Sequence, residues 1–110
     1  MPGCFVTGTD TGVGKTVVAA ALALGWGATY WKPVQSGLAA PPEPATDTAA
    51  VGQWTGIPAA RLLPEAYRLR LPASPHVSAA AEGVTIQRER LRLPSVTGPI
   101  VVEGAGGILV

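Results

Sequence analysis

The glycine-rich segment at residues 8–16, which reads GTDTGVGKT, constrains the fold of this chain more than any other feature. Residues 4–7, just before it, form a short apolar run that predicts a buried strand. Residues 15–24 are rich in alanine and predict a helix, which Gly25 and Gly27 terminate. A strand, a glycine-rich loop and a helix in this order are typical of a P-loop, so we expect a nucleotide-binding α/β domain.

Each part of this loop has a physical task in phosphate binding. Glycines let backbone N–H groups turn inward to form an anion site, and the helix start adds the positive end of its dipole. Lys15 would place a positive charge on the β- and γ-phosphates, and the Thr16 hydroxyl would be a ligand of Mg²⁺. Five residues separate Gly8 from Gly14, one more than in the common pattern, which leaves an ordinary glycine-rich turn as the alternative.

The rest of the chain continues the alternation of strands and helices. Apolar or β-branched runs predict further strands at residues 28–34, 67–71 and 98–103. Capping residues and early prolines predict helices at residues 46–54, 74–82 and 85–93, after a proline-rich loop at 38–44. We therefore expect residues 1–110 to be part of a single α/β domain, with a mostly parallel sheet between flanking helices in a three-layer α/β/α arrangement.

The composition argues against several classes of function. Lys and Arg (8) nearly balance Asp and Glu (7), and a formal net charge of +1 does not suit a nucleic-acid partner. No run approaches the roughly 18 apolar residues of a membrane span, and the N-terminus does not resemble a signal peptide. The single cysteine, Cys4, has no internal partner for a disulfide and fits a reducing compartment. We expect a cytoplasmic protein with no membrane partner.

Four polar residues outside the loop are candidate site residues. Lys32 and Ser36 follow the second predicted strand and Glu103 ends the last one, and in a parallel sheet the carboxyl ends of the strands line the ligand crevice. There Lys32 would neutralise charge during phosphoryl transfer to an anionic acceptor, and Glu103 would hold Mg²⁺ or position water. For Lys32 taken alone, a solvated lysine at a strand end is the simpler interpretation. Asp47 is equally consistent with a metal ligand and with a helix-capping acid.

Other conspicuous residues favour structural interpretations. His76 is the only histidine, and within Ser-Pro-His at a helix start it is more typical of a structural residue than of a base. Trp26, Trp31 and Trp54 are more typical of a core or an interface than of a base-stacking platform. Cys4, inside the first predicted strand, is most simply a core residue.

Taken together, the motifs resemble the dethiobiotin synthetase family of ATP-dependent enzymes in biotin synthesis. The matching segments follow the family order and are FVTGTDT (5–11), VGKT (13–16), KPV (32–34), SG (36–37), Asp47, ASPH (73–76), EG (82–83) and VEGAGG (102–107). The five-residue spacing of the loop is the spacing of this family, so it supports the resemblance. Each segment is unspecific by itself, and the ordered set is specific.

The resemblance implies a reaction that the motifs alone do not define. In that reaction 7,8-diaminopelargonate takes up CO₂ as a carbamate, ATP phosphorylates the carbamate, and the second amine closes a five-membered urea ring with release of phosphate. The implied catalytic residues are Lys32, Lys15 and Thr11, and Ser36 would contact the diamine. ATP would be held by Gly12, Val13, Gly14, Lys15, Thr16, Val17, Asp47, Glu103, Gly104, Ala105 and Gly106, and Mg²⁺ by Thr16, Asp47 and Glu103.

Family members are longer than this chain, so the resemblance implies that it corresponds to their N-terminal half. The other half would supply the adenine-binding loop and much of a homodimer interface, and the isolated chain is expected to be inactive. Three alternatives stay open: a related amide-forming synthetase, a P-loop ATPase that acts as a switch, and an inactive fragment. A switch ATPase usually has a second lysine inside the loop, and residues 9–14 contain none.

Overall fold

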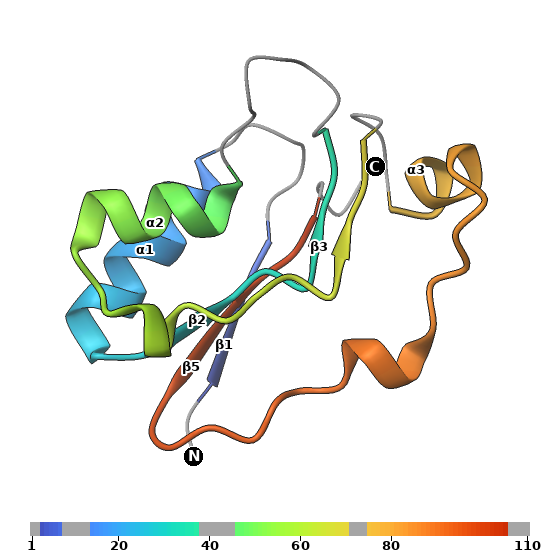
Figure 1. The fold of residues 1–110 in the computed structure, drawn as a ribbon. Coiled ribbons are helices and arrows are strands. Elements are labelled where there is room, and N and C mark those ends of the chain that lie inside the picture. Colours follow the sequence, from blue (N-terminus) through green and yellow to red (C-terminus); the bar gives the residue numbers. More distant parts are fainter. Residues whose placement is uncertain (1–2, 8–13, 38–45, 71–74, 106–110) are drawn as a thin grey trace.

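The computed structural model describes residues 3–7, 14–37, 46–70 and 75–105 of the chain. Three short strands, β1 (Gly3–Val6), β5 (Ile100–Glu103) and β2 (Thr29–Trp31), form a parallel sheet in the order β1-β5-β2 (Figure 1). The strands predicted at 4–7 and 98–103 are confirmed. β5 lies in the middle, in agreement with its β-branched sequence, because the central strand of a parallel sheet is apolar over nearly its whole length.

Two helices cover one face of this sheet. α1 (Lys15–Trp26) packs on β5 and on α2 (Asp47–Thr55), and buried alanines of α1 at 19, 20 and 23 allow the close approach (Figure 1). Tyr30 and Val101 of the sheet face these alanines in a first hydrophobic cluster, which also contains Val51 of α2. The helices predicted at 15–24 and 46–54 are confirmed, although α1 passes Gly25 and ends at Gly27, whose φ of 63° closes the helix.

The opposite face of the sheet is apolar as well. Because strand side chains alternate, Phe5, Trp31 and Val102 point to this side, where they line a cavity of about 510 Å³ together with Leu91 and Leu93. The parallel sheet with flanking helices is confirmed, and within the described residues α1 and α2 both lie on the face opposite this cavity.

The strand predicted at residues 28–34 is divided into two. β2 ends at Trp31, and β3 (Val34–Gln35) pairs in parallel with β4 (Tyr67–Arg68) in a separate two-stranded sheet. Pro33 lies at the division, because a proline has no N–H group for the hydrogen-bond ladder. The strand predicted at 67–71 thus exists in a shorter form, and the loop predicted at 38–44 lies outside the described residues.

The second sheet has its own hydrophobic cluster. Val34, Tyr67, Leu69 and Ala79 form this second cluster, in which Ala79 belongs to α3 (Pro75–Ala81). α3 confirms the helix predicted at residues 74–82, within the part of that range that the structure describes. The two sheets therefore stabilise two neighbouring regions of one fold.

The prediction of a helix at residues 85–93 is wrong. This segment is largely irregular and contains only a short 3₁₀ helix, η2 (Arg88–Leu91), similar in length to η1 (Ala59–Arg61). Tertiary contacts explain the difference: Ile86 packs against the second cluster, and the backbone N–H of Gln87 donates to the Tyr67 hydroxyl at 2.8 Å. These contacts hold Gln87 in an extended conformation, which is incompatible with an α-helix.

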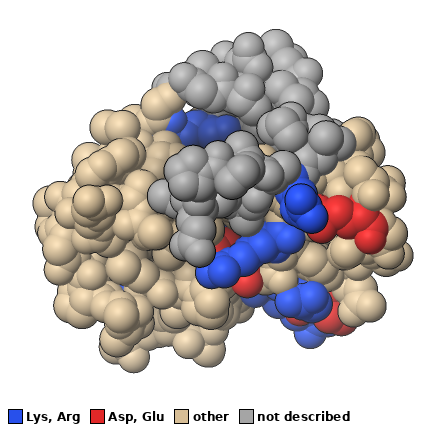
Figure 2. Space-filling model, turned by 45° about the horizontal axis from the view of Figure 1, so that its top comes forward, with Lys and Arg blue, Asp and Glu red and all other residues tan. Residues whose placement is uncertain are grey.

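The tryptophans differ in their surroundings. Trp31 is buried, and its indole N–H donates to the carbonyl oxygen of Pro64 at 3.2 Å, so the core interpretation is correct for this residue. Trp26 and Trp54 are more than half exposed, which excludes a core role in this chain and leaves the interface interpretation as a prediction. The part of the surface over α1 and α2 that is visible in Figure 2 shows almost no charged side chains. No helix within the described ranges is long and apolar enough to cross a membrane.

Candidate active site

A polar cavity of about 390 Å³ lies where β2 and β5 end and where α1 and α2 begin. Both strands run in the same direction, so the residues that follow or end them meet at one edge of the sheet. The cavity is lined by Gly14, Lys15, Thr16, Val17, Lys32, Gln35, Ser36, Asp47, Glu103 and Ala105. Residues far apart in the sequence therefore share one site.

Glu103 is the centre of the hydrogen-bond network in this site. It ends β5 and is 0% exposed. Its Oε2 atom accepts a hydrogen bond from the Thr16 hydroxyl at 2.8 Å and one from the Lys32 ammonium at 3.3 Å, while Oε1 accepts from the Tyr30 hydroxyl at 2.6 Å. Three donors thus compensate for the desolvation of a fully buried carboxylate.

Lys32 is buried between two carboxylates. Its side chain is 6% exposed, and Nζ lies 2.5 Å from Asp47 Oδ2 and 3.3 Å from Glu103 Oε2. This contradicts the simpler interpretation of Lys32 as a solvated lysine at a strand end. A buried cation between two anions is positioned with little freedom, which is the condition for electrostatic stabilisation of developing charge.

Asp47 reaches the cavity because the start of α2 is held in two ways. Thr46 caps the helix by accepting a hydrogen bond from the Ala49 backbone N–H at 3.1 Å. The backbone N–H of Asp47 itself donates to Gln35 Oε1 at 2.9 Å, which ties the helix start to β3. Asp47 is in the first turn and its carboxylate binds Lys32, so Thr46, rather than Asp47, is the capping residue.

The start of α1 supplies the remaining side of the cavity. Gly14 adopts a left-handed conformation with φ of 82°, which favours glycine, and no side chain of the described residues caps the helix there. Backbone N–H groups in the first turn of a helix attract anions, and Lys15 adds a positive charge beside them. Lys15 and Lys32 balance Asp47 and Glu103, so the formal charges of the cavity residues cancel.

Tyr30 does not line the cavity, but its hydroxyl donates to Glu103, which does. Burial, together with the neighbouring Glu103 carboxylate, raises the pKa of the Tyr30 phenol above its usual range, so this hydroxyl keeps its proton and remains a donor. Its ring is 0% exposed within the first cluster.

The side-chain oxygens in this cavity are suitable ligands for a hard divalent cation. Two carboxylates and one hydroxyl, on Asp47, Glu103 and Thr16, meet in the same cavity, and oxygen ligands are those that Mg²⁺ prefers. Thr16 already contacts Glu103, which brings two of the three candidate ligands together. Among the described residues, no three His, Cys, Asp or Glu side chains lie together so that they could hold a metal ion, so a metal there also needs the hydroxyl or ligand oxygens.

The structure brings most of the predicted site residues together. Gly14, Lys15, Thr16, Val17, Lys32, Ser36, Asp47, Glu103 and Ala105 all line the cavity, and their individual roles remain predictions. Gly104 does not line it: a Cβ atom there would lie 2.8 Å from the Phe5 ring, so this glycine serves the packing of the sheet. Thr11, Gly12, Val13 and Gly106 lie outside the described residues. His76 is exposed in α3 and does not line the cavity.

Sequence reasoning missed Gln35 and Tyr30. Gln35 lines the cavity and holds Asp47, whereas Tyr30 holds Glu103. The alternation of strand side chains carries a signal for Tyr30, because residues 30 and 32 of an extended segment point to the same side. No comparable signal marks Gln35, since its partner belongs to a helix start twelve residues away.

Comparisons with known proteins identify relatives of this chain. The ATP-dependent dethiobiotin synthetase BioD of Rhodopseudomonas palustris (strain HaA2) is 63% identical over 105 residues, which are 96% of this chain and 47% of that protein. Proteins of the same name from Nitrobacter hamburgensis and Brucella ovis are 56% identical over 105 residues and 54% identical over 106 residues, with 96% of this chain and 48% of each relative covered. The predicted resemblance to dethiobiotin synthetases is confirmed, and the chain spans about half the length of these relatives. A family model described as an AAA domain matches residues 3–110, so the chain belongs to the AAA domain family.

Proposed function

We propose that the protein containing this chain is an ATP- and Mg²⁺-dependent dethiobiotin synthetase, which carboxylates 7,8-diaminopelargonate with CO₂ and closes its urea ring. The observation that carries the proposal is the connected set of Thr16, Lys32, Asp47 and Glu103 in one cavity at the start of α1. The similarity to proteins named ATP-dependent dethiobiotin synthetase supports the substrate.

The proposed reaction begins with a negatively charged acceptor. One amine of the diamine attacks CO₂ and loses a proton, which gives a carbamate anion. A carbamate oxygen then attacks the γ-phosphorus of ATP, and ADP leaves. The two reacting groups are both anionic, so they repel each other unless positive charge lies between them.

In this proposal Lys32 supplies that charge and Lys15 stabilises the phosphates. The buried position of Lys32, held by Asp47 and Glu103, limits the motion of its ammonium group. The N-terminus of α1 and Lys15 lie on the same cavity and would hold the β- and γ-phosphates. On the family resemblance, Thr11, which lies outside the described residues, would be a further catalytic residue. Mg²⁺, when bound by Thr16, Asp47 and Glu103, would supply further positive charge at the phosphates.

The ring closure would complete the reaction. The second amine attacks the carbonyl carbon of the carbamic-phosphoric anhydride, and phosphate leaves. Ser36 lies on the cavity wall next to Gln35, a position that supports its proposed contact with the diamine. We extend the proposal to a homodimer in the cytoplasm, on the resemblance to the synthetase family.

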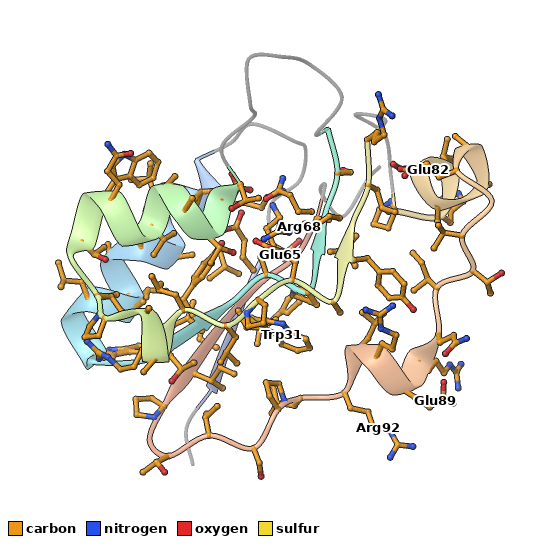
Figure 3. The ribbon with its side chains drawn as sticks, in the orientation of Figure 1. Trp31, Glu65, Arg68, Glu82, Glu89 and Arg92 are labelled. Atoms are coloured by element: carbon orange, nitrogen blue, oxygen red, sulfur yellow. The ribbon has the colours of Figure 1, made fainter. Side chains whose placement is uncertain are left out.

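Phosphate release by a full-length protein containing this chain tests the proposal. With ATP, Mg²⁺ and bicarbonate, release should require 7,8-diaminopelargonate, and Lys32→Ala should lower kcat about 100- to 1,000-fold, as does the loss of one preorganised charge-stabilising donor. Arg92→Ala is the matched control: it also removes a cation, and Arg92 is exposed and outside the cavity (Figure 3).

Two outcomes would contradict the proposal. If ATP is hydrolysed at the same rate without the diamine, the synthetase assignment fails and a switch-type P-loop ATPase takes its place. If Lys32→Ala and Arg92→Ala behave alike, the reaction does not depend on the proposed catalytic cation.

A further inference from the structure

The short hydrogen bond between Tyr30 and Glu103 joins the hydrophobic core to the polar site. The donor is the Tyr30 hydroxyl, the acceptor is Glu103 Oε1, and the two oxygens are 2.6 Å apart. Both residues are 0% exposed, so no water competes for the contact. A hydrogen bond between a hydroxyl and a buried carboxylate is of the strong, charge-assisted kind.

The fold leaves the Tyr30 hydroxyl little freedom. Tyr30 pairs with Val101 in the parallel register of β2 and β5, so its side chain lies on the same face as those of Val101 and Glu103. Its ring packs among Ala19, Ala23 and Val51 in the first cluster, and a ring so enclosed cannot turn away. The phenol oxygen is therefore a fixed point in the site.

Without a fixed hydrogen-bond partner, the carboxylate of Glu103 could rotate. The terminal torsion of a glutamate side chain has a broad, roughly two-fold profile, so rotation exchanges the two oxygens at little cost. In this structure only Oε2 contacts Thr16 and Lys32, while Oε1 is bound to Tyr30. The tyrosine thus determines which oxygen faces the cavity and in which direction.

We propose that Tyr30 is a positioning residue of the site, which orients Glu103 so that Oε2 acts together with Thr16 and Lys32. The inference rests on the proposed function in one respect, namely that Glu103 takes part in holding a divalent cation. Partners that orient a ligand in this way commonly change metal affinity when they are removed.

The test is Tyr30→Phe in a full-length protein containing this chain, with the affinity for Mn²⁺ in the presence of ATP measured by electron paramagnetic resonance. Phenylalanine keeps the ring in the core and removes only the donor. We expect the Mn²⁺ dissociation constant to rise about tenfold, at the lower end of the effect of outer-shell partners. Equal affinity in wild type and variant would overturn the proposal.

Tyr67→Phe is the matched control. Tyr67 is also a buried tyrosine with one hydroxyl contact, but it accepts from the Gln87 backbone N–H in the second cluster and does not line the cavity. Its removal should leave the Mn²⁺ affinity unchanged. A similar loss in both variants would show a general effect of core tyrosines and would contradict a specific role of Tyr30.

A double-mutant cycle separates positioning from mere stability. If Tyr30 acts through Glu103, Tyr30→Phe should change Mn²⁺ affinity in the wild-type background and add nothing in a Glu103→Ala background, which lacks the group that Tyr30 orients. Additive losses would overturn the proposal. Metal binding is measured without the diamine, so this result stands apart from the test of the synthetase reaction.

A second measurement covers the case in which Tyr30→Phe does not fold. The Tyr30 hydroxyl proton, buried in a short bond to a carboxylate, should give a downfield proton NMR signal in the wild-type protein. Addition of Mg²⁺ and ATP should shift this signal, because the charge on its acceptor is then shared. A signal that does not respond to Mg²⁺ would overturn the proposal.

Discussion

The regions around the two sheets of this chain bury similar apolar residues but differ in how many charged side chains they bury. The first sheet, with α1 and α2, encloses Lys15, Lys32 and Glu103, each at most 8% exposed. Beside the second sheet one carboxylate, that of Glu65, is buried with its side chain 1% exposed, and its partner Arg68 is 64% exposed. Arg90 is exposed and lies over the face of the Tyr67 ring at 4.3 Å. Because buried charges cost free energy unless they are paired, a region that keeps several of them is a functional candidate, whereas charges on the surface serve packing and solubility.

The two buried tyrosines show the same difference on a smaller scale. Tyr30 donates to a carboxylate of the site, and Tyr67 accepts from a backbone N–H that holds an irregular segment. The first contact holds a carboxylate that lines the cavity, and the second replaces a backbone hydrogen bond that a helix would otherwise supply. The difference predicts which substitutions impair binding and which impair stability.

Glu103→Gln should have the largest effect on binding. Glutamine keeps an acceptor for Tyr30 but removes the charge, so Mg²⁺-dependent ATP binding should weaken about 100-fold or more. The loss of stability should be small by comparison, because Lys32 keeps its ion pair with Asp47 and is not left unpaired. Isothermal titration with ATP in the presence and absence of Mg²⁺ measures the first effect, and thermal unfolding measures the second.

Glu82→Gln is the control for this prediction. Glu82 accepts a hydrogen bond from the Arg70 backbone N–H outside the cavity, so its substitution should leave Mg²⁺ dependence unchanged. Equal losses in the two variants would remove the distinction between the two regions.

Leu69→Ala should have the largest effect on stability. Leu69 is 1% exposed in the second cluster, and truncation of a buried leucine lowers the free energy of unfolding by about 2–5 kcal/mol. Leu93→Ala, at a position that is 60% exposed, should cost much less. Urea unfolding of both variants measures the difference.

The Leu69→Ala variant also tests whether the second cluster affects the cavity. Mg²⁺-ATP affinity of the folded Leu69→Ala protein should match wild type, because Leu69 does not line the cavity. A weaker affinity would show that the second cluster also positions Gln35, whose carbonyl oxygen accepts from the Leu69 N–H at 2.7 Å.

The ion pair between Glu65 and Arg68 should have the smallest effect. The two side chains point toward one another between α2 and the second sheet, with Oε1 and Nε 2.9 Å apart (Figure 3). Burial by itself would raise the pKa of Glu65, but the nearby Thr48 hydroxyl, the backbone and Arg68 together lower it below its ordinary 4.5. The stabilisation is therefore complete above that pH and is lost as the pH falls through the lower pKa of the folded state.

Glu65→Gln should remove this pH dependence. The Glu65 side chain is only 1% exposed, but Arg68 is 64% exposed, so water screens one partner of the pair and we expect a contribution of about 1 kcal/mol at neutral pH. Urea midpoints of wild type and variant should differ at pH 7 and converge as the pH is lowered below 4.5, whereas Glu89→Gln, at an exposed position, should follow wild type. Curves for Glu65→Gln that stay parallel to wild type would contradict the prediction.

Local sequence signals predicted the elements that carry the site. The Gly-Lys-Thr segment after an apolar run indicated the start of α1, and the β-branched run at residues 100–102 indicated β5. Lys32 and Glu103 were each predicted to lie at the ligand crevice, because parallel strands present their carboxyl ends at one edge. Signals within a few residues were sufficient for these features.

Other features depend on contacts between distant residues. The segment at 85–93 has a helical pattern, yet Ile86 and Gln87 are held by the second cluster and by Tyr67. The division of the strand after Trp31 depends on the pairing of β3 with β4, thirty-three residues further along the chain. The intrinsic preference of a short segment for helix or strand is weak compared with such packing, so tertiary contacts override it.

The sequence alone determined the P-loop start of the fold, the family resemblance and most residues of the cavity, because spacing along a strand or a helix start sets which side chains meet. Only the tertiary structure decided that Lys32 lies buried between Asp47 and Glu103, that Gln35 ties down α2, and that Tyr30 orients Glu103. The physical reason is that burial and hydrogen-bond partners are properties of packed elements, and no local pattern records which distant donor reaches a given oxygen.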